Sequence, residues 1–71
     1  MVINFKLITE VGEFISDEMR VTNEQYQNLL EMSKTFYNGG YDMWIPSGFL
    51  VASPEIIKKS ILIIQIVNQD G

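Results

Sequence analysis

The aromatic side chains that could take part in binding are gathered in one segment, residues 36–49. It holds five of the eight aromatic residues, the only tryptophan, three glycines and one proline. Aromatic faces stack against a nucleobase or a partner's side chain, and backbone N–H groups beside glycines can approach anionic oxygens closely. Tyr37, Tyr41 and Trp44 are therefore the candidate stacking residues. Packing inside the hydrophobic core or hydrogen bonding at the surface is the alternative role for each of them.

Two basic residues outside this segment are candidates for holding an anion. Arg20 is the only arginine and precedes an expected helix, where a guanidinium group can grip a phosphate or a carboxylate. Lys58 belongs to the only lysine pair and could hold a phosphate across an oligomer interface. The alternatives are a surface ion pair for Arg20 and, for Lys58, a solvated charge that protects the edge of a strand.

The residues that usually carry hydrolytic or redox catalysis are missing. The chain has no histidine and no cysteine, so the common general base, thiol nucleophile and zinc ligands are lacking. Four carboxylates lie close in sequence and could bind a divalent cation or form an acid/base pair; they are Glu10, Glu13, Asp17 and Glu18. Their spacing matches no metal-binding loop, and a solvated acidic rim explains them. We therefore predict no enzyme activity, no metal site and no cofactor.

Length, charge and hydropathy exclude several classes of protein. A chain of 71 residues makes a single domain, residues 1–71. A net charge of −4 disfavours binding to the backbone of a nucleic acid. No apolar run reaches the roughly 18 residues of a membrane helix, and the N-terminus lacks a secretory signal pattern. We expect a cytoplasmic protein without nucleic-acid or membrane partners.

The first half of the chain predicts a hairpin and a helix. Residues 2–9 alternate between apolar and polar, residues 13–16 can form the return strand, and Gly12 suits the turn between them. A helix is expected over residues 23–37. Its start is marked by a capping box of Thr22 and Gln25 and by the apolar pair Val21 and Tyr26, and its end by the Asn-Gly-Gly that follows.

The second half predicts three strands. Residues 43–45 and 49–52 are short strands separated by a Pro-Ser-Gly turn, and Pro54 marks a second break or one short helical turn. Residues 60–67 form the most apolar stretch, and their β-branched content favours a strand. The order is β-β-α-β-β-β. The expected fold is α+β, a small antiparallel sheet with one helix packed on one face.

The last strand requires apolar neighbours on both of its faces. Within residues 61–67 only Gln65 is polar, and a half-exposed strand would alternate. A single helix covers one face, so the other is expected to meet an identical sheet in a homo-oligomer, a dimer or a larger assembly. The alternative is a sheet that curls on itself like a small barrel and hides both faces within one chain.

The segments Tyr37-Asn38-Gly39-Gly40-Tyr41 and residues 43–49, followed by the apolar strand at residues 61–67, carry a resemblance. In these residues, and in size, acidity and element order, the chain resembles small phage-encoded homo-oligomeric sponge proteins that sequester nucleotide immune signals, such as ADP-ribose derivatives of the Thoeris defence system. The resemblance implies a non-catalytic anti-defence protein in the cytoplasm of the host cell. Its pocket would lie between subunits, with aromatic rings stacking the base and a few donors holding the phosphates. The implied ligand-binding residues are Arg20, Tyr37, Tyr41, Trp44, Ser47 and Lys58.

Two other functions fit the same sequence. A protein–protein interaction module would dock on a host protein and inhibit it, with the acidic stretch from Glu10 to Glu18 steering it toward a basic partner. A purely structural subunit would assemble into a closed oligomer that has no pocket.

Overall fold

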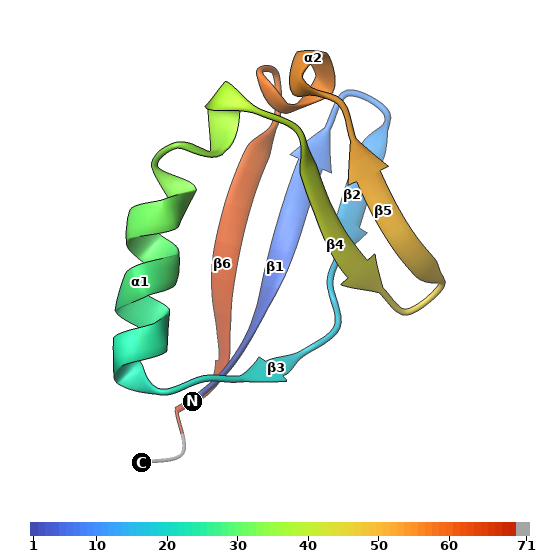
Figure 1. Ribbon diagram of the computed structural model, residues 1–71. Coiled ribbons are helices and arrows are strands. Elements are labelled where there is room, and N and C mark those ends of the chain that lie inside the picture. Colours follow the sequence, from blue (N-terminus) through green and yellow to red (C-terminus); the bar gives the residue numbers. More distant parts are fainter. Residues whose placement is uncertain (70–71) are drawn as a thin grey trace.

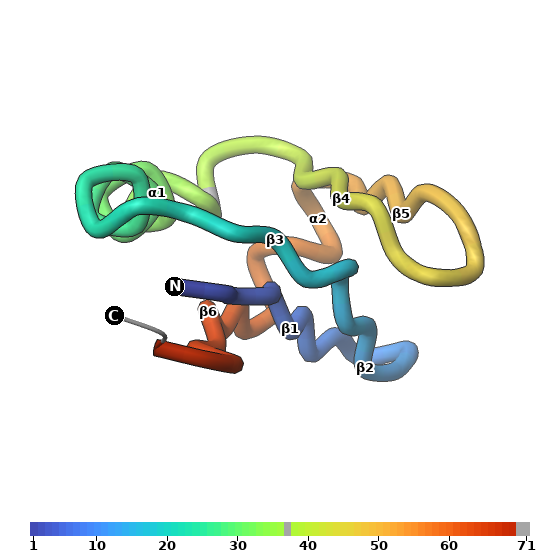
Figure 2. The backbone as a smooth tube through the Cα atoms, turned by 90° about the horizontal axis from the view of Figure 1, so that it is seen from below, coloured from blue at the N-terminus to red at the C-terminus, as the bar shows by residue number. Residues whose placement is uncertain are grey.

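The computed structural model describes residues 1–69 of the chain, apart from the side chain of Tyr37. Its elements form two layers (Figures 1 and 2). One layer is an antiparallel sheet, and the other contains a helix and a separate hairpin that lie over one face of this sheet. The α+β class expected from the sequence is confirmed. In chain order the elements are β1 (Val2–Thr9), β2 (Gly12–Ile15), β3 (Met19–Arg20), α1 (Asn23–Ser33), the 3₁₀ turn η1 (Phe36–Asn38), β4 (Tyr41–Ile45), β5 (Gly48–Ala52), α2 (Pro54–Ile57) and β6 (Ile61–Asn68).

Strand β1 is the centre of the larger sheet. It pairs with β6 along one edge, and along the other edge it pairs first with β3 and then with β2. All of these pairings are antiparallel. The β1–β2 hairpin turns at Glu10 and Val11, and β2 begins directly after them at Gly12, whose φ of +145° is rarely adopted by residues other than glycine. The hairpin predicted from residues 2–9 and 13–16 is therefore confirmed.

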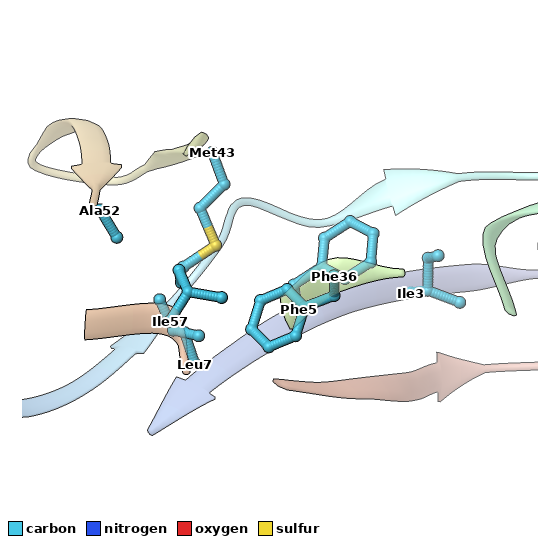
Figure 3. Close-up of a cluster of buried hydrophobic side chains, with 7 residues drawn as sticks. All are labelled: Ile3, Phe5, Leu7, Phe36, Met43, Ala52 and Ile57. Atoms are coloured by element: carbon cyan, nitrogen blue, oxygen red, sulfur yellow. The ribbon is translucent and has the colours of Figure 1, made fainter. Parts of the chain in front are cut away.

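The hydrophobic core lies between the layers and is built on alternate residues of β1. Ile3, Phe5 and Leu7 point toward the helix and hairpin, as the period of two requires. Four further buried side chains meet them from the covering elements (Figure 3). These are Phe36, Met43, Ala52 and Ile57. Burying one such large side chain contributes about 1.5–3 kcal/mol, so a core of this size stabilises the fold only modestly.

Helix α1 begins where the sequence predicted and ends early. The backbone N–H of Gln25 donates to Thr22 Oγ1 at 3.1 Å, and the backbone N–H of Thr22 donates to Gln25 Oε1 at 2.9 Å, so the capping box is confirmed. The predicted end near residue 37 is wrong, because α1 stops at Ser33. The backbone N–H of Thr35 bonds three residues back, to the carbonyl of Met32. Such bonds tighten the last turn.

The β4–β5 hairpin forms a second sheet, whereas β6 joins the first sheet beside β1. Strands β4 and β5 pair only with each other among the described residues, and their inward residues Met43 and Ala52 face the core. The segment after Pro54 is the short helix α2, which places Ile57 in the core. No helix within residues 1–69 has both the length and the apolar character required to cross a lipid bilayer.

The capping box makes a testable contribution to stability. Thr22→Ala removes the acceptor for the Gln25 N–H, and we expect the free energy of unfolding to fall by about 1 kcal/mol. Urea denaturation followed by circular dichroism measures this change. Thr35→Ala is the matched control because Thr35 lies beyond the end of α1, and its hydroxyl donates to the carbonyl of Met32 in an exposed hydrogen bond. Equal losses in the two variants would contradict the role of the cap.

Candidate functional site

A cavity of about 530 Å³ lies between strand β4 and the link that joins β2 to β3. We call it the aromatic groove. Residues from β1, from the link and from the β4–β5 hairpin line it, so it forms only when the two layers come together. Its lining residues are Phe5, Ser16, Asp17, Glu18, Met19, Tyr41, Asp42, Met43, Trp44 and Phe49.

Ser16 holds the link in place on one side of the groove. Its side chain is buried, its Oγ accepts the backbone N–H of Phe5 at 2.7 Å, and its own N–H donates to the Phe5 carbonyl at 2.8 Å. The backbone N–H of Asp17 then donates to the Trp44 carbonyl at 3.1 Å. Hydrogen bonds from two consecutive residues, Ser16 and Asp17, thus fix the link to β1 and to β4. This places Asp17 and Glu18 along the groove.

The aromatic side of the groove is braced by ring contacts. Trp44 faces Phe49 across the hairpin, with ring centroids 4.8 Å apart and planes at 60°. Tyr41 meets Phe36 edge to face at 5.4 Å. Trp44 nevertheless remains 68 % exposed, so one side of the indole is available to a ligand. The ring contacts limit how far these side chains can move, which lowers the entropy lost on binding.

A second cavity of about 310 Å³ lies beside α1. Leu29, Met32 and Leu62 are among its lining residues, and its surface is mostly apolar. Phe5 and Tyr41 line both cavities. The two cavities are therefore neighbours that share part of their walls.

The aromatic groove is electronegative. Asp17, Glu18 and Asp42 line it, and neither Lys nor Arg is among its lining residues in the described part of the chain. Burial raises the pKa of Tyr41 from 10.0 to about 12, and the neighbouring Asp42 carboxylate adds to this rise. Both effects favour the neutral phenol over its anion. A second negative charge is thus unfavourable at this position.

The structure brings together two of the six residues predicted to bind a ligand. Tyr41 and Trp44 both line the aromatic groove. Ser47 lies in the β4–β5 turn and does not line it, and Arg20 and Lys58 do not line it either. Arg20 is on β3 and Lys58 follows α2, and these elements lie at opposite ends of the molecule (Figure 1). The side chain of Tyr37 is outside the described residues.

Sequence reasoning missed several residues of the groove. Phe49 could have been found, because the hairpin register places it opposite Trp44. Asp17 and Glu18 were interpreted as part of a solvated rim. No local sequence signal shows that the link carrying them lies against β4, since the contact joins Asp17 to Trp44 across more than twenty intervening residues.

Neither a metal-binding cluster nor a similar known protein assigns a chemistry to the groove. Across residues 1–69, carboxylates do not converge in a group that could hold a metal ion. No protein-family model, no curated protein and no solved structure matches the chain. The inference about function therefore depends on the geometry and charge of the groove.

The raised pKa of Tyr41 predicts a loss of stability at high pH. Below pH 10 the phenol is protonated in both the folded and the unfolded chain. Between pH 10 and about 12 the unfolded chain loses this proton while the folded chain keeps it, so the free energy of unfolding falls as pH rises through that window.

Urea denaturation at pH 9 and at pH 11 measures this loss. Tyr41→Phe should show a smaller fall between the two pH values than the wild-type protein does. Tyr26→Phe, which alters a tyrosine on α1 outside the groove, is the matched control and should behave like the wild type. An identical fall in wild type and Tyr41→Phe would rule out Tyr41 as its source.

Proposed function

We propose that the protein is a non-catalytic interaction module that holds a positively charged segment of a partner protein in the aromatic groove. The observation that carries this proposal is the lining of the groove. It combines exposed aromatic surface with three acidic residues and has no basic residue among its described lining residues. Docking on a basic partner through the acidic stretch from Glu10 to Glu18 is the second hypothesis from the sequence, and it is supported by Asp17 and Glu18 of that stretch, which line the groove.

Lysine and arginine side chains match this lining in two ways. A cation over the face of an aromatic ring is favourable by about 0.5–1 kcal/mol at an exposed site and by about 2 kcal/mol when water is excluded. The indole of Trp44 offers such a face. Asp42 lies two residues before Trp44 on β4, so the two side chains share a face of the strand, and its carboxylate can pair with the same cation. A volume of about 530 Å³ is within the ordinary range for ligand sites.

Sequestration of a nucleotide-derived signal is the second candidate. It is supported by the shared placement of Tyr41 and Trp44, because either ring can stack a nucleobase. The phosphates of such a ligand would lie near Asp17, Glu18 and Asp42, whereas Arg20 and Lys58 are elsewhere. Repulsion between these charges places the nucleotide second to a cationic ligand.

Trp44 is the only tryptophan, so its fluorescence reports directly on the groove. We expect an arginine- and lysine-rich octapeptide to change this fluorescence saturably, with an affinity that weakens as salt rises. ADP-ribose, added in a parallel titration, should produce no saturable change. A saturable response to ADP-ribose and none to the peptide would replace the first function with the second.

A pair of charge variants separates binding in the groove from general attraction to an acidic protein. Asp42→Asn should weaken peptide binding by roughly fivefold, which corresponds to about 1 kcal/mol. Glu31→Gln removes the same charge from the exposed surface of α1, where Glu31 pairs with Lys34, and should leave the affinity unchanged. Equal weakening by the two substitutions would contradict binding in the groove.

A further inference from the structure

The sheet of β2, β1 and β6 has an outer face that no described element covers. Helices α1 and α2 and the β4–β5 hairpin all lie on the opposite side of this sheet (Figure 2). The outer face is made by the residues that alternate with the buried Ile3, Phe5 and Leu7. We infer that this face binds a second copy of the chain, so that two sheets pack face to face and the groove of each copy points away from the interface.

Four isoleucines surround Lys6 on the outer face. Lys6 pairs with Ile15 on one side and with Ile63 on the other, and Ile8 pairs with Ile61, so these side chains share one face. Ile15, Ile61 and Ile63 are 47 %, 56 % and 39 % exposed. Apolar side chains gathered on one face and open to water mark an interaction site.

The charges on the outer face favour a second copy as the occupant. By register this face carries Lys6, Glu13 and Arg20, and the Lys6 Nζ lies 3.4 Å from a carboxylate oxygen of Glu13. One acid accompanies two bases here, although the whole chain has a net charge of −4. Two copies meeting through this face therefore keep most of their acidic residues apart. Two copies meeting through the groove would bring acids together.

The size of the outer face sets how much area a dimer could bury. Strands β1 and β6 have eight residues each and β2 has four. With strands about 4.8 Å apart and a rise of about 3.3 Å per residue, they cover about 320 Å² in projection for each copy, or about 640 Å² for the pair before the relief of the side chains is added. A specific interface needs about 1,000 Å² in total, so the relief of the side chains has to supply the remainder.

The core shows why such a partner would stabilise the fold. Helix α1 contributes no buried residue, and only seven apolar side chains are buried among the described residues. Chains of this size commonly need a disulfide, a metal or an oligomer to supplement the core. The sequence has no cysteine and no histidine, which leaves the oligomer.

Sedimentation equilibrium tests the proposal on the full chain. The wild-type protein should have about twice the 8.2 kDa mass of one chain, and its melting temperature should rise with protein concentration. Ile15→Lys should halve the measured mass. Val51→Lys is the matched control, because Val51 is 75 % exposed on β5, outside the outer face, and this variant should remain a dimer.

The variant at Ile15 also distinguishes face-to-face packing from pairing along the β6 edge. Ile15 lies on β2, on the other side of β1 from β6, so a dimer joined through β6 edges would survive its substitution. A dimeric Ile15→Lys variant would therefore overturn the proposal. So would a wild-type monomer at millimolar concentration, or a Val51→Lys variant that dissociates while Ile15→Lys does not.

Two further measurements keep the test decisive. If Ile15→Lys does not fold, Ile61→Lys on β6 replaces it. Independently of any variant, a wild-type melting temperature that does not change with protein concentration overturns the proposal. A folded Ile15→Lys monomer should bind the basic octapeptide with the wild-type affinity per chain. Failure of peptide binding in the wild type would count against the proposed function and leave the interface intact.

Discussion

The structure depends on one constraint: β1 is paired along both edges but covered on only one face. Its inward residues Ile3, Phe5 and Leu7 supply the platform on which every covering element packs. The same strand carries Asn4 and Lys6 on the other face. A chain of this length has enough helix and hairpin to cover one side of three strands, and the opposite side is left to solvent or to a partner.

The groove exists because the elements that cover the sheet are short and few. Helix α1 and the β4–β5 hairpin each pack on the platform, but α1 buries no residue of its own. The groove beside β4 and the cavity beside α1 are therefore both lined by side chains that would be enclosed in a larger domain, Phe5 and Tyr41 above all. Two short hydrogen bonds to Phe5 and one to Trp44 hold the link at residues 16–17 against the groove. The groove thus has defined walls, although its neighbours are short elements.

Features with a local cause could be predicted from the sequence. The alternation in β1, the turn at Gly12 and the Thr22–Gln25 cap each involve residues close in the chain, and the structure confirms all three. The end of α1 was not predictable in this way. Residues 34–37 continue the helical pattern, but the chain leaves the helix early and delivers Phe36 to a core whose other members come from distant strands.

The site was only half predictable for the same reason. Tyr41 and Trp44 were chosen because aromatic residues crowd one segment, and the hairpin keeps that segment together. Arg20 and Lys58 were chosen for their charge alone, and nothing in their sequence neighbourhood specifies which end of the molecule they occupy. The acidic wall depends on a contact between the β2–β3 link and β4, which is a property of the tertiary fold rather than of either segment.

The distribution of charge joins the two proposals into one arrangement. Acidic residues line the groove, on the covered side of the sheet, while the outer face carries one acid and two bases by register, together with four isoleucines around Lys6. Repulsion between acidic residues therefore opposes apolar packing least on the outer face. Attraction for a cation is strongest on the groove side. Because the two surfaces are on opposite sides of β1, self-association would leave both grooves open. A dimer of this kind would present two equivalent sites, so a partner with two basic segments would gain from binding both.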